Sequence, residues 1–572
     1  MTNLEVAWIF REIADLLELS GENPFKVKAY RKAARILPKL EQDIKELISS
    51  NKLKEMPGIG KTLQANIEEL LATGNLNLLQ DLRQKVPAGL REMLAIPDIG
   101  VRSIRIIYEA LGVTTLDELE KAAKDNQLRK LPGLGSKTEL AVLRGIEMLR
   151  NKQGLIPLGI AFMVANEFIQ SLSMLNSVVN LGITGPLRRG VEMVPEIILL
   201  AAVLKEEPEV IEIFARHPQV QEVLLRCNSL CRVSTRLGAE VELRLVPPER
   251  FWIENFLSTG SDEHLAGLNK IIGEKYGLTD LLLSTLSSKG FQVNSEEELY
   301  KWLSMQYIEP ELRENRGEIQ AALQNELPNL VTQSDIRGDL HTHTDWSDGV
   351  SSIEQMIESA KKMKYSFIAI TDHSRSLSIA NGLSLEKLVE QNRCISEISA
   401  RMENLTILRG VEVDILGDGS LDYPDEVLAE MDIVVASIHT GFKMEREKMT
   451  ARLERAVKNP HVDILAHPTG RMLGRRRAYE ADMEKIIELA CKTGTWLEIN
   501  ASPDRLDLND FWARQAKDMG VPISINTDAH DASRLKDMTY GVLTARRSWL
   551  QAKDVVNTWP VERILEETKR KK

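Results

Sequence analysis

The sequence predicts a multidomain protein with an all-α N-terminal part and a C-terminal domain of the α/β class. Its 572 residues are enough for three to five domains at roughly 100–200 residues per domain. Between residue 4 and about residue 150, apolar side chains recur at spacings of three and four, which indicates amphipathic helices. Beyond residue 335, short runs of Ile, Val and Leu alternate with helical stretches, which is typical of a parallel sheet, either a barrel or doubly wound.

Composition excludes several classes of protein. A hydrophobic fraction of 43% supports real cores and rules out a disordered or fibrous chain. The longest apolar run near the middle, residues 197–204, is far shorter than the ~20 residues of a membrane span, and the first residues lack a signal layout. The four cysteines are too scattered for a disulfide framework. We therefore expect a cytoplasmic monomer that does not contact membranes.

One motif occurs three times in the N-terminal part. An apolar-Pro-x-x-Gly turn followed by an amphipathic helix begins at residues 56, 96 and 131. Glycine permits a close backbone approach, and a helix start presents free N–H groups, so a phosphate fits there. A single turn of this kind is more often an ordinary helix connector, whereas three copies favour a binding function. The turns resemble helix-hairpin-helix modules, which bind the DNA backbone, although the middle copy has Asp98 in place of a glycine.

Basic residues also gather in this part. Residues 24–40 contain six lysines and arginines and no acid, in a chain whose net charge is −11. A solvated helix face explains some of them, but the run favours a stripe that faces phosphate. The predicted DNA-binding residues are Gly58, Gly60, Lys61, Gly133, Gly135, Lys137, Lys28, Arg31 and Lys32.

Histidine is concentrated in the C-terminal domain. Residues 341–572 are 232 of the 572 residues, so about four of the nine histidines are expected there by chance, and seven are found. A single histidine is more often a packing residue than a ligand, but six of these, with three acids, follow predicted strands, where functional groups of α/β folds gather. Nine such side chains could hold two or three divalent ions. The predicted ligands are His341, His343, Asp348, His373, Glu412, His439, His467, Asp528 and His530.

These motifs resemble the PHP (polymerase and histidinol phosphatase) domain at all nine positions. The resemblance implies a distorted barrel that binds three divalent metals, manganese, zinc or iron. It also implies how the ligands are shared. One ion is held by His341, His343, Glu412 and Asp528, a second by Glu412, His439 and His467, and a third by Asp348, His373 and His530.

The order of the motifs is similar to that of bacterial family X DNA polymerases with a fused 3′–5′ exonuclease. Three motifs of that family have counterparts here: its triphosphate-binding turn at residues 184–190, the strand with its third metal-binding carboxylate at 241–251, and its sugar-recognition turn at 258–264. The resemblance implies an α+β nucleotidyltransferase-like middle domain. The resemblance implies an N-terminal helical domain over 1–85, a second helical domain over 86–150 and the nucleotidyltransferase-like domain over 151–315. A linker over 316–335 and the PHP domain over 336–572 follow.

The polymerase metal site is altered in this alignment. Its three carboxylate positions are Glu196, Ile198 and Glu242, and isoleucine cannot ligate the Mg²⁺ that such a domain uses. The site is therefore predicted to be degenerate, with polymerase activity weak or lost, unless Glu192 substitutes or the alignment is shifted. Arg188 and Arg189 are interpreted either as phosphate ligands or as surface arginines. The position of the family's lyase lysine is Asn66, which cannot form an imine, although Lys61 lies nearby in sequence.

The predicted function is metal-dependent phosphoester hydrolysis at DNA 3′ ends. We expect a 3′–5′ exonuclease or 3′-end-processing enzyme of base-excision repair, acting on gapped or nicked DNA, with AP endonuclease activity as a variant. Glu412, His341 and Asp528 are the expected catalytic residues, and Arg375 and Arg471 bind the substrate phosphate or lie in exposed basic loops. The alternatives are a gap-filling polymerase with proofreading, a small-molecule PHP phosphatase and a non-catalytic scaffold.

Overall fold

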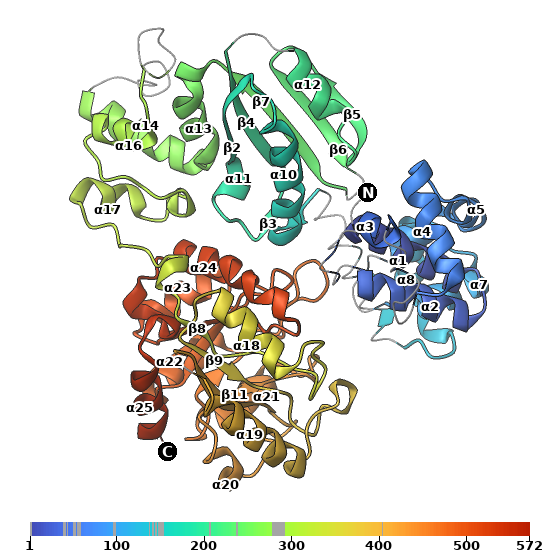
Figure 1. Cartoon of the computed structure of the whole chain (residues 1–572), viewed down its shortest axis with the longest axis vertical. Helices are drawn as coiled ribbons and strands as arrows, with labels where there is room; N and C mark the ends of the chain where they lie inside the picture. The colour runs from blue at the N-terminus through green and yellow to red at the C-terminus, as the bar shows by residue number, and fades with distance from the viewer. Residues whose placement is uncertain are drawn as a thin grey trace. The chain divides into compact units, whose positions relative to one another are not determined.

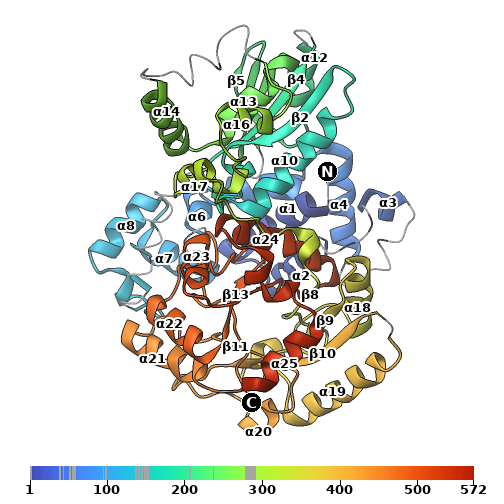
Figure 2. The same cartoon turned by 90° about the vertical axis from the view of Figure 1, so that its left-hand side faces the viewer.

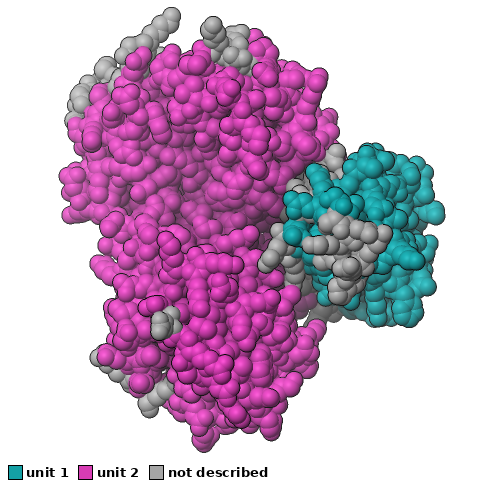
Figure 3. Space-filling model, viewed as in Figure 1, with its two compact units in different colours: residues 1–153 teal, residues 154–572 magenta. Residues whose placement is uncertain are grey.

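A computed structural model of the chain divides it into two compact units, Met1–Gln153 and Gly154–Lys572, coloured separately in Figure 3. It describes residues 3–37, 40, 42, 44–49, 53, 59–94, 96, 99–135, 138–139, 142–143, 146, 154–204, 208–235, 238–276, 286, 292–402 and 404–571. None of the helices in these ranges is long and apolar enough to cross a membrane.

The first unit is helical, as predicted. Its described helices are α1 (Asn3–Leu19), α2 (Pro24–Ile36), α3 (Ile44–Ser49), α4 (Lys61–Thr73), α5 (Asn77–Lys85), α6 (Ala88–Met93), α7 (Val101–Leu111) and α8 (Leu116–Lys124). Two of them have glycines at both ends. α4 starts after Gly60 and α7 after Gly100, and each ends at a glycine with positive φ. Gly133 in the third turn also has a positive φ, of 76°. Glycine is favoured at such positions because other residues are strained there.

The second unit begins with a middle region, residues 154–335, built around a five-stranded sheet (Figure 1). Its strands are β2 (Val178–Thr184), β4 (Ile197–Val203), β7 (Glu240–Val246), β6 (Leu230–Thr235) and β5 (Val220–Arg226), in that spatial order. Only β4 and β7 pair in parallel. Leu199 and Ala201 of β4 share a core with α10 (Leu158–Leu172) and α12 (Pro208–Ala215). Leu200 and Ala202, on its other face, pack with Phe251 of α13 (Phe251–Thr259). This mixed sheet with helices agrees with the predicted fold class.

The residues expected to form a linker are folded. Residues 316–335 contain α17 (Glu318–Gln324), whose Ile319 and Ala322 belong to the core of the middle region. The Glu318 carboxylate is fully buried and lies 2.6 Å from Nδ1 of the equally buried His264. A helix that packs into the core and a buried carboxylate paired with His264 are not features of a linker.

The barrel region, residues 336–571, contains seven parallel strands. They are β8 (Gly338–Asp339), β9 (Phe367–Ile370), β10 (Thr406–Asp414), β11 (Ile433–Ser437), β12 (Ile464–Leu465), β13 (Trp496–Asn500) and β14 (Ile523–Asn526), adjacent in sequence order. The segments after β8 and β14 exchange backbone hydrogen bonds, since His343 N–H donates to Ala529 (2.9 Å) and Asp528 N–H to His341 (3.0 Å). The sheet is thus nearly closed, which confirms the distorted barrel.

Helices connect and surround these strands (Figure 2). They are α18 (Ile353–Lys362), α19 (Leu385–Ser399), α20 (Asp425–Leu428), α21 (Arg446–Val457), α22 (Met483–Thr493), α23 (Asp510–Asp518), α24 (Met538–Arg547) and α25 (Val561–Lys571). The alternation of strand and helix puts every strand's carboxyl end at the same end of the barrel.

Buried ion pairs join the middle and barrel regions. The Glu314 carboxylate accepts from Arg189 Nε (3.0 Å) and from Arg547 Nη1 (2.9 Å). Asp510 accepts from Arg547 and from Arg316, and Leu473 and Leu506 of the barrel region lie in the same core as Leu158 of the middle region. Charge pairing and apolar packing both cross this boundary.

Glu296 of α16 (Glu296–Trp302) is the most heavily paired acid of the middle region. It is buried and accepts two hydrogen bonds from Arg313 (2.9 and 3.0 Å) and two from Arg188 (2.8 and 2.7 Å). Burial alone raises the pKa of this carboxyl, but Arg313 and Arg188 lower it to about 2. The carboxylate therefore contributes stability that is present above pH ~4.5 and lost as the pH falls toward 2.

Replacing Glu296 with Gln is expected to lower the free energy of unfolding by about 3–5 kcal/mol, because it leaves the fully buried Arg313 without its counter-charge. Urea unfolding at several pH values measures this loss, which should shrink in acid as the wild-type carboxylate becomes protonated. The exposed Glu297→Gln variant of the same helix serves as control. Equal stability of the two variants at neutral pH would contradict the prediction.

Candidate metal centre

The structure brings the nine predicted ligands together at the carboxyl ends of the barrel strands. His341 and His343 follow β8, and His373 follows β9. Glu412 lies in β10, and Asp348 in the loop before α18. The others follow later strands: His439 after β11, His467 after β12, and Asp528 and His530 after β14. Because the strands are parallel, residues almost 190 positions apart meet at one end of the barrel.

The Glu412 carboxylate lies at the centre of the cluster, and its side chain is 1% exposed. Five imidazoles approach it. Its Oε2 lies 3.5 Å from His341 Nε2, 3.4 Å from His343 Nε2 and 2.7 Å from His373 Nδ1, and its Oε1 lies 3.3 Å from His439 Nε2 and 3.2 Å from His467 Nε2.

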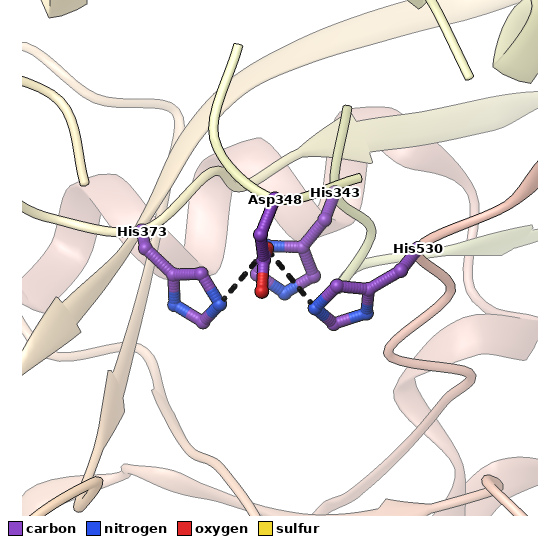
Figure 4. Close-up of side chains that lie close together, drawn as sticks. All are labelled: His343, Asp348, His373 and His530. Carbon is purple, nitrogen blue, oxygen red and sulfur yellow. Dashed lines mark ion pairs between the residues drawn. The ribbon is translucent and has the colours of Figure 1, made fainter. Parts of the chain in front are cut away.

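Three overlapping groups of these side chains are compact enough to hold an ion. They are His343, Asp348, His373 and His530; His341, His343 and Asp528; and His373, Glu412 and His439. In the first group the Asp348 carboxylate lies between two rings, 3.4 Å from His373 Nε2 and 3.2 Å from His530 Nε2 (Figure 4). His373 belongs to two of these groups, whereas the resemblance assigns it only to the ion held with Asp348 and His530.

The donor set fits divalent cations. Buried nitrogens of His341, His343 and His373, and Oε2 of Glu412, make no hydrogen bond to any residue that the structure describes. An unsatisfied buried polar atom costs about 1–3 kcal/mol, so their convergence is costly unless a cation occupies the space between them. Imidazole and carboxylate ligands suit zinc, manganese and iron. The pocket can therefore bind divalent ions.

A second layer of acceptors orients the imidazoles. Nδ1 of His341 lies 2.8 Å from Glu498, Nδ1 of His439 lies 2.6 Å from Asp414, and Nδ1 of His530 lies 2.8 Å from the backbone oxygen of Asp528. When Nδ1 donates to these oxygens, Nε2 of each ring is free to face the centre. Glu498 is fully buried and also accepts from the backbone N–H of His467 (2.7 Å).

Sequence reasoning missed Glu498 and Asp414. Glu498 is the acid inside the otherwise uncharged strand β13, and Asp414 is the last residue of β10, two positions after Glu412. A carboxylate in a buried strand costs several kcal/mol unless it is paired, and that cost is the signal that could have marked both residues.

The electrostatics differ from one predicted ligand to the next. Burial lowers the pKa of His439 and His530, but Glu412 and Asp414 raise that of His439 to about 10, and Asp348 and Asp528 raise that of His530 to about 9. Burial raises the pKa of Glu412, but His439, His373 and His341 hold it well below its ordinary value. Burial and the neighbouring His530 and His373 lower the pKa of His343 to about 3. The central carboxylate is therefore ionised and His343 is neutral at physiological pH.

The two arginines predicted to bind substrate phosphate are already paired. Arg375 donates from Nε to the Asp422 carboxylate (3.2 Å) and from Nη2 to its backbone oxygen (2.9 Å). Arg471 donates to both oxygens of Glu192 (2.9 and 2.5 Å) and to the backbone oxygen of Leu506. Each guanidinium is bound by a carboxylate that is not one of the nine predicted ligands.

The three positions that the alignment assigns to the polymerase carboxylates lie on or beside the sheet of the middle region. Ile198 of β4 is buried and pairs with Glu242 of β7 in register, while Glu196 precedes β4. The Glu242 carboxylate accepts from Arg232 Nε (2.8 Å) and Arg244 Nε (2.6 Å), and these arginines hold its pKa below the ordinary value against the effect of burial. Among the described residues, every group compact enough to hold an ion lies in the barrel region.

Arg188 and Arg189 are neither free phosphate ligands nor surface arginines. Arg188 is bound by Glu296, and Arg189 by Glu314 and by the backbone oxygen of Thr259 (2.7 Å). Both guanidiniums are mostly buried, so each is a structural cation in this arrangement.

Part of the predicted DNA-binding set is exposed. Gly60 and Lys61 open α4, whose start has no side-chain cap, and the Gly133–Gly135 turn has open space where a Cβ would project. Arg31, by contrast, pairs with Asp15 (3.1 Å) and Glu18 (2.5 Å) of α1, so the basic run does have counter-charges. Lys28 and Lys32 are exposed and form no ion pair with a described residue. Gly58 and Lys137 lie outside the described residues.

Comparison with family models gives three matches. Residues 1–76 match a helix-hairpin-helix domain, residues 90–147 a SAM-like helix-hairpin-helix tandem, and residues 339–502 a PHP domain. These matches cover the first unit and most of the ligand positions of the barrel.

Comparison with curated proteins gives relatives of two kinds. The chain is 38% identical over 567 residues, 97% of each chain, to the DNA polymerase/3′-5′ exonuclease PolX of Bacillus subtilis (strain 168). It is 32% identical over 250 residues to a probable phosphatase of Thermoanaerobacter sp. (strain X514), which covers 41% of this chain and 96% of that protein. A probable phosphatase of Acetivibrio thermocellus is 30% identical over 246 residues, covering 41% of this chain and 95% of that protein.

Replacing Glu498 with Gln is expected to lower divalent-metal affinity about 10- to 100-fold, because an amide cannot accept from every donor that now orients His341 and the His467 backbone. Titration of metal-free protein with Mn²⁺ or Zn²⁺, followed by calorimetry, measures the change. The exposed Glu488→Gln variant of α22 should bind metal like the wild type. Unchanged affinity in Glu498→Gln would remove this carboxylate from the support of the centre.

Proposed function

Because the chain belongs to the family X DNA polymerases that carry a PHP domain, we propose that it is a metal-dependent phosphoesterase that degrades or trims DNA from 3′ ends. The observation that carries the proposal is the buried Glu412 carboxylate, surrounded by five imidazoles that each bring a ring nitrogen within 3.5 Å of it. The substrates we propose are gapped or nicked DNA in base-excision repair, with AP endonuclease activity as a variant of the same hydrolysis.

We assign three divalent ions, manganese, zinc or iron, to the nine ligands. The compact groups support one ion near His341, His343 and Asp528 and another near Asp348, His373 and His530. Glu412 and His439 support the remaining one, with His467 3.2 Å from the Glu412 carboxylate. Ions bound there would act as Lewis acids that polarise the phosphoryl oxygens and make the attacking water easier to deprotonate.

The chain's own residues then set the reaction geometry. Glu412 touches ligands of all three groups and so fixes the spacing between them, while Glu498 and Asp414 keep His341 and His439 turned toward the centre. The burial of Glu412, His341 and His343 removes bulk water from the rear of the pocket, which strengthens electrostatic interactions with a phosphate.

The N-terminal unit favours DNA over a small phosphomonoester as substrate. The relatives named as probable phosphatases match only 41% of this chain, and a small substrate does not need the helix-hairpin-helix modules that it carries in addition. We assign backbone contacts to the exposed helix start at Gly60 and Lys61, the Gly133–Gly135 turn, and Lys28 and Lys32.

We further propose that polymerase activity is weak or lost. Two-metal nucleotidyl transfer needs carboxylates on neighbouring strands, but this chain has Ile198 at one position and a Glu242 held by two arginines at another. The alternative, a gap-filling polymerase with proofreading, is favoured by the name of the Bacillus subtilis relative.

His341→Ala and Glu412→Ala are each expected to reduce 3′–5′ degradation by several decades and to leave DNA affinity nearly unchanged, because the ligands lie outside the DNA-binding modules. Digestion of 5′-labelled gapped DNA with added Mn²⁺ tests the rate, and fluorescence anisotropy tests binding. His461→Ala, before β12 rather than after it, is the matched control. Nuclease activity at the wild-type rate in both ligand variants would rule out the centre as the active site.

Ile198→Asp is not expected to restore DNA synthesis. The new carboxylate would enter a buried position whose side chain packs against Gly185, and Glu242 would still be bound by Arg232 and Arg244. Primer extension with Mg²⁺ or Mn²⁺ on gapped DNA is the measurement, with the wild type alongside. Efficient extension by the wild type would contradict the loss of polymerase activity, and efficient extension by the variant alone would contradict the expectation that Ile198→Asp does not restore synthesis.

A further inference from the structure

One guanidinium beside the metal centre has no hydrogen-bond partner. Arg505 lies in the loop after β13, and its side chain is only 17% exposed. Its Nε is 3.6 Å from Oδ2 of Asp528, and the side chain donates no hydrogen bond to any residue that the structure describes. A guanidinium carries five N–H donors. Because the described residues provide no acceptor for those of Arg505, they are available to bind an anion.

Other arginines of the barrel region near this end are already bound. Arg375 is held by Asp422, Arg471 by Glu192, and Arg534 by Asp537 (2.7 Å). Arg505 differs because its nearest carboxylate, Asp528, is shared. Oδ1 of Asp528 faces His343 at 3.2 Å, and Oδ2 accepts from Asn500 at 3.1 Å. Asp528 therefore holds the Arg505 guanidinium near the ligands without saturating it.

The middle region fixes the loop that carries Arg505. The next residue, Leu506, is fully buried in the core that also contains Leu158 and Val194. A Cβ at Gly159 of α10 would lie 2.5 Å from Cβ of Pro503, so the helix and the loop are in close contact. Within the barrel region, the backbone oxygen of Asp504 accepts from Leu473 N–H (2.7 Å). The position of Arg505 thus depends in part on the sheet-and-helix body of the middle region.

Building on the proposed function, we propose that Arg505 binds the non-bridging oxygens of the substrate phosphate at the metal centre. A planar guanidinium can donate two parallel N–H bonds to one phosphate, which a lysine cannot do. The middle region then has a second role, because its packing against residues 503–506 keeps this phosphate ligand in place. Sequence reasoning missed Arg505 because it follows no histidine motif.

Arg505→Gln in the full-length, metal-loaded protein tests the assignment, with inorganic phosphate as the probe. Phosphate affinity, measured by calorimetry, is expected to fall about 10- to 100-fold, the loss expected for hydrogen bonds to a charged group. Metal content, measured by elemental analysis, is expected to stay unchanged, because Arg505 is not a ligand. Arg505→Lys should recover part of the affinity, and Arg393→Gln, on the exposed face of α19, should behave like the wild type.

Gly159→Ala tests the role of the middle region from a distance. Alanine favours a helix more than glycine, but here the methyl group would displace Pro503, so phosphate affinity should fall in the same direction as in Arg505→Gln. Unchanged phosphate affinity in Arg505→Gln would overturn the assignment, as would a loss of metal from that variant. If phosphate binding depends on Arg505 but the protein does not degrade DNA, the proposed function is wrong and the role of Arg505 in phosphate binding is still supported. Thermal unfolding of each variant confirms that it is folded.

Discussion

A single buried carboxylate organises the barrel region. Glu412 is almost fully buried near the carboxyl end of β10, with five imidazoles around it. Burying one ionised carboxylate costs several kcal/mol unless cations compensate it. Protonated histidines or bound metal ions are the compensating charges available, so the fold and the metal centre depend on the same interaction. The second layer of Glu498 and Asp414 extends this dependence to the neighbouring strands.

In the middle region, charged side chains are paired with one another at the positions that the alignment assigns to the polymerase site. Where a polymerase would use carboxylates and metal ions, this chain has Ile198 in the apolar core and an Arg232–Glu242–Arg244 cluster. Arg188 and Arg189 are similarly bound by Glu296 and Glu314. Charges that could act on a nucleotide are therefore used to stabilise the domain and its boundary with the barrel region.

The sequence predicted most of the fold because its signals are local. The helical periodicity, the glycine turns and the seven strands can each be recognised within about 20 residues. The convergence of the nine ligands followed from the rule that parallel strands end together. The partners of Arg375, Arg471 and Arg31 could not be predicted, because Asp422, Glu192 and Asp15 reach them through tertiary packing. The same is true of Glu318 in residues 316–335, whose carboxylate pairs with the buried His264.

The charge pairs that join the middle and barrel regions bear on where the chain can be cut. A fragment that starts at residue 336 would leave Arg547 without Glu314 and would expose Leu473 and Leu506 to water. Both changes cost free energy, and the exposed apolar surface would favour aggregation. The barrel is therefore expected to be less stable as such a fragment than within the full chain, although phosphatase relatives consist of little else.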